Sequence, residues 1–515
     1  MRYGHLGPFY KIVNAVSRGC VGVVLYPDPE EFPDIKETDR VISNAKRVAG
    51  DPLTPGFASF SENSYRINFN DTIGHQLPPE IPVITASQKM VKPALSSLID
   101  NSIENATTGE LFPDPLSRNV STDTTVTIEV NNDFPHENTF RTVCAYRGDL
   151  DPDKMVLVGT RHDEVGSGIV DPTSGQAVMR EIMRLLTSHH DIYTPRRSIV
   201  FVTTDASHVD IASQEFIEEN LREYGERVVA YVALTGTLSQ GSYLSVKASK
   251  PVQNFMKEIT SNLTEIEAVH HGINGSNYYR RYMANLAVPV IEMSFTDKLE
   301  ANISGLDSLP LCCDHSVANT DEERIKLAAK VHLQTIMRLA GDPLLPYSII
   351  ETRYLFMRGI HMLSVNLEHL VGLELNDLLT TLVKLIAAST NLEIRLNNTA
   401  STEISDIGLR RINDALMGMS RSSILSHGVP MLDPRDKTKV IRNVNNRNLL
   451  IGSISSNDDE VLLFPGLEEL IYAPVKSDEI MEALAIHVTE VMTAMGNIID
   501  YAMRAMVDEA SFTPV

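Results

Sequence analysis

The chain has 515 residues, of which 43% are hydrophobic and 22% charged, and its formal net charge is −22. This length exceeds what one hydrophobic core supports, so about two to four globular domains are expected. The excess of acidic residues argues against a nucleic-acid partner, because phosphate contacts depend on clustered Lys and Arg. No apolar run reaches the roughly 18 residues that a membrane span requires.

Four cysteines, Cys20, Cys144, Cys312 and Cys313, are too few for a disulfide-built fold and leave the redox compartment open. The first residues, MRYGHLGPFYK, lack the apolar core of a signal peptide, so we interpret the start of the chain as truncated. Sequons for N-glycosylation nevertheless point toward a secreted glycoprotein. They lie at Asn70, Asn105, Asn119, Asn262, Asn274, Asn302 and Asn397.

The first part of the chain predicts a small α/β module. Short apolar, β-branched runs at 21–26 and 81–87 are bounded by Gly and Pro, and the second leads into an amphipathic segment. The segment 101–122 is polar and contains Pro and Asn, as a linker does. We therefore expect a first domain over residues 1–122.

Strands and helices are expected to alternate over residues 123–345. Near-continuous apolar strands such as SIVFVTT, separated by amphipathic helices, predict a mostly parallel sheet covered on both faces. Such sheets bind ligands at the carboxyl edge of their strands. The expected strands lie at 125–130, 155–160, 198–204, 228–234, 242–248 and 288–295, and the expected helices at 174–188, 211–224, from 251, and at 321–339.

The last part of the chain, residues 346–515, shows helical periodicity and predicts a helical bundle. Its last expected helix, at 478–507, carries Met and Ala on several faces, so it should pack on more than one side. Association with a second copy through these helices is the expected consequence. The other helices are expected at 348–373, 375–390 and 404–419.

The order of several motifs resembles one known family. A module that begins RYG and contains GDPLTPG is followed by VGTRHD, IVDPTSG, DHS and, near the end, FPGLEELIY. The chain is similar to the glutamate carboxypeptidase II and transferrin receptor family. The resemblance implies a protease-associated (apical) module that is N-terminally truncated, a zinc-exopeptidase α/β domain and a helical dimerisation domain. It also implies a cell-surface or extracellular ectodomain, although this chain contains no membrane span.

Active members of this family hold two zinc ions and use a further Glu as general base, so that the paired ions activate a bridging water. Asp171 in IVDPTSG matches the bridging aspartate, and His315 in CCDHSV matches the last histidine ligand. An acidic residue at a helix N-terminus is also stabilised by the helix dipole without metal, so the role of Asp171 stays open.

Other positions depart from the family pattern. Arg161 stands where the first histidine ligand belongs, with His162 one place later, and Thr235 replaces an aspartate ligand. In DASHV, Ser207 takes the position of the general base and His208 that of another ligand. A serine hydroxyl cannot accept a proton from zinc-bound water near neutral pH, and losing such a base removes about 10²–10⁴ of the rate.

The retained positions leave two interpretations of the metal site. Asp171, His208 and His315 surround one of the two ions and are compatible with a single zinc, to which the adjacent cysteine pair could add a thiolate. An empty site held by hydrogen bonds is the other interpretation. His162 is either a polar loop residue or a replacement for the lost ligand.

Substrate recognition also departs from the family. Glu292 and Ser294 in VPVIEMSF lie where carboxypeptidase relatives have arginines that hold a substrate carboxylate, so glutamate specificity is not expected. Arg2 and Asn277 match pocket positions of the family, whereas Arg47 replaces an asparagine.

A structural calcium site of the family is also matched. Its ligands would be Thr54, the Phe57 carbonyl, Glu215 and Glu218, with one residue deleted before Glu215. Oxygen ligands from two elements suit calcium. Exposed helix carboxylates without an ion are the alternative.

The leading hypothesis is a catalytically degenerate family member, a pseudoenzyme that acts as a dimeric binding or receptor-like protein for an unknown protein or peptide ligand. One alternative is an active zinc-dependent exopeptidase, a carboxypeptidase that uses His162 and His208 in a rearranged metal site. Another is an incomplete chain that folds poorly, because the α/β domain lacks its opening strands.

Overall fold

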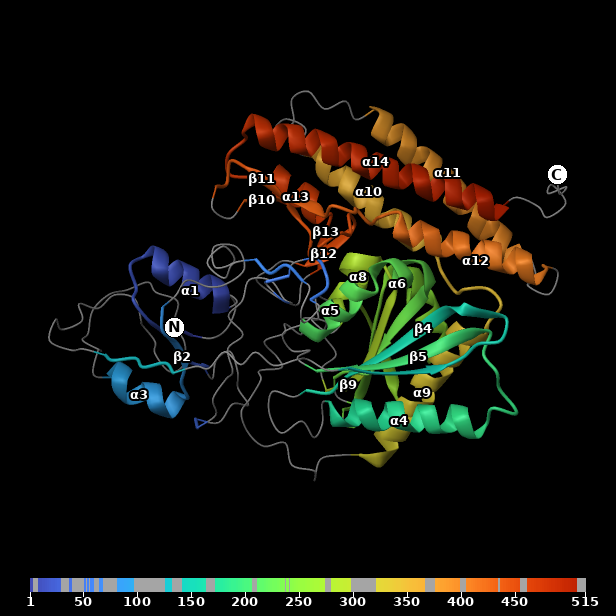
Figure 1. Ribbon diagram of the computed structural model, residues 1–515, viewed down its shortest axis with the longest axis horizontal. Helices are drawn as coiled ribbons and strands as arrows, with labels where there is room; N and C mark the ends of the chain where they lie inside the picture. The colour runs from blue at the N-terminus through green and yellow to red at the C-terminus, as the bar shows by residue number, and fades with distance from the viewer. Residues whose placement is uncertain are drawn as a thin grey trace.

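The computed structural model shows elements near the N-terminus, a twisted sheet covered by helices, and a layer of long helices above that sheet (Figure 1). None of the helices in the described residues is long and apolar enough to cross a membrane. The structure describes residues 1–2, 8–28, 37–38, 51, 53–54, 56–59, 64–67, 81–96, 126–131, 141–163, 172–205, 211–236, 238–239, 241–273, 279–297, 321–365, 376–398, 404–433, 436–453 and 461–506.

The elements near the N-terminus form a small α/β unit around a two-stranded parallel sheet. Its strands, β1 (Val23–Leu25) and β2 (Val83–Thr85), lie inside the two predicted apolar runs and pair in the register Val23↔Val83. Leu25 is fully buried, as expected for a strand that is covered by a helix. The helices of this unit are α1 (Pro8–Ser17) and α3 (Gln88–Ser96).

The central part is a seven-stranded sheet with the order β3-β5-β4-β6-β9-β7-β8. The pairs β4–β5, β4–β6, β6–β9 and β7–β8 are parallel, whereas β3 and β7 run antiparallel to β5 and β9. The predicted mostly parallel sheet is therefore confirmed. The strands are β3 (Arg141–Tyr146), β4 (Asp151–Arg161), β5 (Arg197–Thr204), β6 (Val228–Ala233), β7 (Tyr243–Ala248), β8 (Glu267–Gly272) and β9 (Val290–Thr296).

Helices cover both faces of this sheet because its strands are apolar on both sides. Val156 and Val158 of β4 belong to one core cluster, whereas Met155 and Leu157 belong to another on the opposite face. The first cluster includes α4 (Thr173–Ser188), α7 (Gln253–Ser261) and α9 (Glu322–Gly341). The second includes α5 (Ile211–Glu219), α6 (Leu221–Arg227) and α8 (Arg280–Leu286).

Several local predictions in this part were wrong. Residues 126–131 form no strand, although a strand was expected at 125–130. The helix expected at 211–224 is two helices, α5 and α6, which meet at Asn220. Strands β3 and β8 and helix α8 were not predicted, because β3 is exposed on both faces and β8 is half-buried, so neither has the apolar pattern of a central strand.

The C-terminal part is mostly helical but also contains short strands that were not predicted. The hairpin β10 (Val429–Leu432) and β11 (Val440–Asn443) is antiparallel, as is the pair β12 (Ile451–Ser453) and β13 (Val461–Leu463). Helix α11 packs against α10 and α14, and α14 also packs against α12. The helices are α10 (Ile349–Val365), α11 (Asn376–Asn398), α12 (Asp406–Arg421), α13 (Pro465–Ile471) and α14 (Asp478–Met506).

Candidate functional site

The predicted zinc ligands fall largely outside the described residues. Asp171, His208 and His315 lie there, and so do Ser207 and several further predicted positions, namely Arg47, Asn277, Cys312 and Cys313. Among the residues that the structure does describe, no group of three or more His, Cys, Asp or Glu side chains could hold a metal ion. The single-zinc set therefore stays a prediction, while the positions of the lost ligands, Arg161 and Thr235, can be examined directly.

The ends of β4, β5 and β6 bring these positions to one edge of the sheet. Arg161, the last residue of β4, pairs with Thr204 at the end of β5, and Gly159 pairs with Ala233 at the end of β6. Thr235 lies two residues beyond Ala233. Because the three strands are parallel, Arg161 and Thr235 share the carboxyl edge at which open α/β sheets bind ligands.

Arg161 is buried at this edge, whereas the neighbouring His162 is exposed. The Arg161 carbonyl accepts a hydrogen bond from Nε2 of Gln176 at 2.9 Å, and the His162 backbone N–H donates to the Thr204 carbonyl at 2.8 Å. A guanidinium carries only N–H donors and a permanent positive charge, so Arg161 cannot act as a metal ligand. The exposure of His162 favours the interpretation of a polar loop residue.

Thr235 is also buried, and its hydroxyl is used inside the sheet. Its Oγ1 donates a hydrogen bond to Oε1 of Glu292 at 2.8 Å, and the other carboxylate oxygen of Glu292 lies 3.2 Å from Nζ of Lys247. Glu292 is in register with Ala233 on one side and with Lys247 on the other. A chain of polar contacts therefore crosses β6, β9 and β7 beside the predicted zinc edge.

Lys247 was not predicted as part of this site. The sequence predicts that the Glu292 carboxylate disfavours an anionic substrate group, and the structure pairs that carboxylate with the Lys247 ammonium. This contact depends on the antiparallel pairing of β7 with β9, which no local pattern around Lys247 reveals. Ser294, predicted beside Glu292, is half-buried on the same strand.

The motif IVDPTSG has a packing role that is visible without metal. A methyl group at Gly175 would overlap the Leu234 carbonyl, and Oγ1 of Thr160 donates to that same carbonyl at 2.7 Å. Ser174 accepts a hydrogen bond from the Leu238 N–H at 3.3 Å. Only glycine allows the first turn of α4 to approach the end of β6 this closely, so the Ser-Gly of this motif is explained by helix–sheet contact.

The predicted calcium ligands Thr54, Glu215 and Glu218 lie together. Glu215 Oε2 accepts from the Ser59 N–H at 2.5 Å, and its Oε1 lies 3.3 Å from Oγ1 of Thr54. Glu218 Oε1 accepts from the Gly56 N–H at 3.0 Å. Two carboxylates of α5 thus hold the GDPLTPG loop through its backbone and side chains.

The electrostatics of this carboxylate cluster suit a cation. Burial, together with the charges of neighbouring carboxylates, raises the pKa of Glu215 to about 7 and that of Glu218 to about 8. Oε2 of Glu218 is buried and has no hydrogen-bond partner within the described part of the chain. Asp51, which was not predicted as a ligand, accepts a hydrogen bond from Thr54 Oγ1 at 2.9 Å.

Two further predicted positions contribute less. Phe57 is exposed, and its N–H lies 3.4 Å from the Thr54 carbonyl, as in a tight turn of the same loop. Arg2 forms a β-bridge with Tyr26, and its carbonyl accepts from Nζ of Lys11 at 2.6 Å, so its backbone is part of the N-terminal unit.

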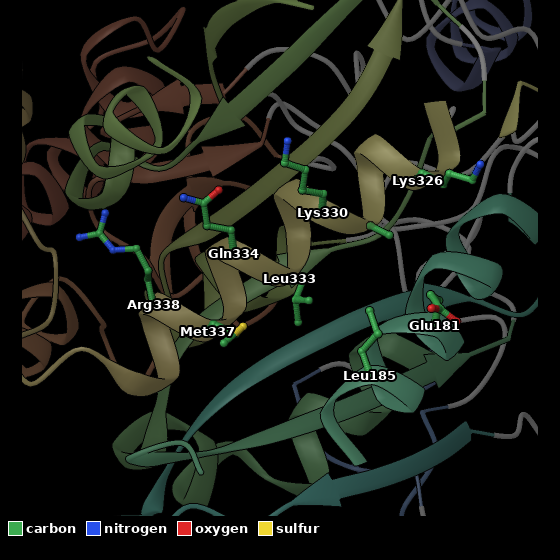
Figure 2. Close-up of a pocket in the computed structure, with 9 residues that line it drawn as sticks. Glu181, Leu185, Lys326, Lys330, Leu333, Gln334, Met337 and Arg338 are labelled. Carbon is green, nitrogen blue, oxygen red and sulfur yellow. The ribbon is translucent and has the colours of Figure 1, made fainter. Parts of the chain in front are cut away.

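A groove of about 570 Å³ between α4 and α9 lies apart from these positions (Figure 2). Leu185 and Leu333 face each other across it, and residues of these two helices line it throughout. No residue of a strand end contributes to its lining, so this groove is not the ligand-binding edge of the sheet. Its lining residues are Glu181, Leu185, Lys326, Ala329, Lys330, Leu333, Gln334, Met337 and Arg338.

Comparisons with known proteins identify relatives of the chain. No protein-family model matches it. It is similar to aminopeptidase NAALADL1 of Mus musculus, with 28% identity over 287 residues that cover 51% of this chain and 38% of the relative. It is also similar to transferrin receptor protein 1 of Gallus gallus, with 22% identity over 366 residues that cover 66% of this chain and 46% of the receptor.

Transferrin receptor protein 2 of Homo sapiens is 23% identical over 392 residues, which cover 67% of this chain and 46% of the receptor. Each match thus spans less than half the length of these relatives. Among solved structures, the zinc aminopeptidase BSAP from Bacillus subtilis aligns with a TM-score of 0.43 and 14% identity over 66% of this chain and 69% of that chain. The sequence matches confirm the predicted resemblance, since the chain is similar both to aminopeptidase NAALADL1 and to the transferrin receptors.

Proposed function

We propose that this chain is a catalytically degenerate member of its family, in which part of the zinc-binding edge serves the structure of the sheet. The observation that carries the proposal is the buried hydrogen bond from Thr235 to Glu292. Zinc sites use anionic carboxylates or thiolates and neutral imidazoles, and a threonine hydroxyl that already donates to a carboxylate offers none of these. The charge of Glu292 is in turn compensated by Lys247.

Arg161 supports the same proposal from the adjacent strand. Its buried guanidinium occupies the position of the first histidine ligand and keeps a positive charge at every accessible pH. Two positive charges of a zinc ion and one of arginine repel each other most strongly where water is excluded. Two ligands of one zinc ion are therefore replaced. The histidine is replaced by the cationic Arg161, and the aspartate is replaced by Thr235, whose hydroxyl already donates to Glu292.

Metal content and peptidase activity test this proposal on the purified chain. We expect at most one zinc per chain, and hydrolysis of N-acetyl-aspartyl-glutamate and of aminoacyl nitroanilides no faster than in a metal-free blank. Two zinc ions per chain, with a chelator-sensitive turnover within about a hundredfold of an active relative, would support the exopeptidase alternative and overturn the proposal.

Variants separate a degenerate site from a rearranged one. If one zinc is bound, His315→Ala should remove it, whereas His162→Ala should leave the zinc content unchanged. The triple variant Arg161→His, Ser207→Glu and Thr235→Asp should raise the zinc content above that of the natural chain. A loss of zinc in His162→Ala would show that this residue has replaced the missing ligand.

We further propose that calcium binds between α5 and the GDPLTPG loop. Thr54, the Phe57 carbonyl, Glu215 and Glu218 supply only oxygen atoms, which are the ligands that calcium prefers. The buried Oε2 of Glu218 accepts no hydrogen bond from the described residues, which leaves it as a candidate calcium ligand. The role of this ion would be structural, because it would join an N-terminal loop to a helix of the central sheet.

Association with a second copy is proposed through the outer face of α10 and α11. Apolar side chains on this face are exposed at helical spacing, among them Val365 and Val383, which are 66% and 65% exposed. Scattered exposed apolar residues are ordinary, but a stripe of them at helical spacing on each of two packed helices is typical of an interface. The stripe consists of Tyr354, Met357 and Val365 on α10 and Leu379, Val383 and Ile394 on α11.

An extracellular location is proposed from the resemblance and from the sequons. Among the described sequons, Asn262 follows α7 and Asn397 lies near the end of α11, and both side chains are exposed. Exposure is the condition for N-glycosylation in a secreted protein. The ligand of the extracellular protein would be a protein or peptide.

A further inference from the structure

Glu490 on α14 gathers hydrogen-bond donors from three elements of the C-terminal part. It accepts from Nδ1 of His487 at 2.6 Å, from Nε2 of His427 at 2.8 Å and from Nη1 of Arg442 at 3.1 Å. His427 lies just before β10, Arg442 lies on β11, and His487 is one turn earlier on α14. The cluster therefore joins the β10–β11 hairpin to α14.

The tautomer of His487 is fixed by this arrangement. Burial alone would raise the pKa of Glu490, but hydrogen bonds from His487, His427 and Arg442 lower it to about 2. Glu490 is therefore an ionised acceptor at any physiological pH, and Nδ1 of His487 must carry the proton that it donates. Nε2 of the neutral ring is then left as the acceptor nitrogen.

Nε2 of His487 lies in a closed, apolar position. The His487 side chain is 0% exposed, and its Nε2 has no hydrogen-bond partner among the residues that the structure describes. A methyl group added at Gly466 of α13 would lie 2.5 Å from Nε2 and 2.8 Å from Cδ of Pro430 on β10. A second ring proton would therefore lie beside Gly466 and would meet no acceptor among the described residues.

We propose that the His427–Glu490–His487 cluster is an acid-sensitive latch, which seats the β10–β11 hairpin on α14 at neutral pH and loosens it when His487 is protonated. Placing an N–H on Nε2 buries a donor without a partner and a charge without water. Release of the hairpin, which meets Glu490 through Arg442, would admit water to the ring and relieve this cost.

The charges around His487 set the direction of the pH effect. Burial lowers the pKa of His487, its contact with Glu490 opposes this, and the positive charge of Arg442 and the nearby His427 add to the lowering. Gly466, which lies beside the ring on α13, does not titrate. His487 binds a proton more weakly when the hairpin is attached to α14 than when it is released. The attachment is therefore fully stable above the ordinary histidine pKa of 6.5 and weakens as the pH falls below that value.

Hydrogen exchange of the whole chain tests the latch without any variant. Amides of residues 427–443 and of the middle of α14 should become less protected when the pH falls from about 7.5 to about 5.5, after correction for the intrinsic exchange rate. The opening constant should rise by up to about tenfold over this range, because only the pH unit below the ordinary histidine pKa of 6.5 favours the open state. Protection that does not change between these pH values would overturn the proposal.

Variants identify which histidine senses the acid. His487→Asn keeps a donor near the Nδ1 position but cannot be protonated, so its hairpin protection should not depend on pH. His427→Gln keeps a donor near Nε2 and should retain the pH dependence of the natural chain. Loss of the pH dependence in His427→Gln, or its persistence in a folded His487→Asn, would refute the assignment.

A second buried histidine provides the matched control. His332 on α9 is 0% exposed, its Nδ1 contacts the Ala328 carbonyl at 2.8 Å, and burial lowers its pKa to about 4. It lies on a different helix, one that packs on the central sheet. His332→Asn should therefore leave the pH dependence of the hairpin unchanged, and a flat response in this variant would show a general acid effect instead of a latch.

Discussion

The pKa values of Glu215 and Glu218 depend strongly on the burial and the charges around them. They lie three positions apart on α5, so both carboxyl groups project from the same side of the helix toward the GDPLTPG loop. Burial raises the pKa of both, and each charge adds to the cost of ionising nearby carboxyls. At neutral pH such a pair is stable only if it holds a proton or a cation.

Glu218→Gln is therefore expected to change the pH dependence of stability. The folded chain binds this proton more tightly than the unfolded chain, whose ordinary glutamate pKa is 4.5. The stability from the protonated carboxyl is thus fully present below pH 4.5 and is lost as pH rises through about 8. Without divalent ions, Glu218→Gln should raise Tm near pH 8, by about 2–4 °C for each kcal/mol recovered.

Calcium should produce a comparable rise in Tm in the natural chain and a much smaller one in Glu218→Gln, because bound ligand stabilises only the folded state. Glu226→Gln is the matched control, since Glu226 is exposed on α6 and should change neither response. Equal calcium responses in the natural chain and in Glu218→Gln would exclude this carboxylate as a ligand.

At the residue scale, the chemical character of a side chain could be predicted from the sequence, but the residues that it contacts could not. Thr54, Glu215 and Glu218 were predicted together from family positions, and the structure places them in contact. Thr235 could be recognised as a poor zinc ligand, because this follows from its side chain alone. The hydrogen bond from Thr235 to Glu292 depends on the strand order β6-β9-β7, and so does the pairing of Glu292 with Lys247. This order cannot be predicted from local sequence patterns.

At the scale of elements, charged side chains fix α12 against the amino ends of β4 and β5. Asp151 and Arg196 are both buried and lie 2.6 Å apart, and Arg196 also pairs with Asp406 at the start of α12 at 2.9 Å. Arg410, one turn along α12, pairs with the half-exposed Asp153. The Asp151 carboxylate of this network is shielded from water, whereas the Asp153 carboxylate, two positions later in the chain, is not.

Asp151→Asn and Asp153→Asn should differ sharply in stability because of this difference in burial. Breaking the buried pair leaves Arg196 partly uncompensated and should cost about 3–5 kcal/mol. Loss of the exposed pair between Asp153 and Arg410 should cost about 0–1 kcal/mol. Denaturant midpoints, with hydrogen exchange of α12, measure both variants, and equal losses would contradict this account.

Elements with strong apolar periodicity were predicted, and those without it were missed. The buried strands β4, β5, β6 and β9 have near-continuous apolar sequences, and the prediction of a mostly parallel sheet follows from them. Strands β10 to β13 are only three or four residues long, which is too short for a period-two pattern to appear. Their places are set by α13 and α14, against which they pack.

At the scale of the whole molecule, the layer of α10, α11 and α14 lies above the sheet and presents a face away from it (Figure 1). The net charge of −22 adds repulsion between two copies. At physiological salt the Debye length is about 8 Å, so charges far from a contact contribute little. Burial of the apolar stripe should therefore dominate if the contact reaches about 1,600 Å².

The double variant Leu379→Lys and Val383→Lys is expected to convert a dimer of the natural chain to a monomer at micromolar concentration, as measured by sedimentation. Both side chains are exposed on α11, so the variant should fold normally. Added lysines make the chain less acidic and weaken long-range repulsion, so loss of the dimer would have to come from the lost apolar contact.

Ile407→Lys is the matched control, because Ile407 is 84% exposed on α12, beside Asp406 and its contact with Arg196. This control should remain dimeric, and a natural chain that sediments as a monomer would refute the proposed interface.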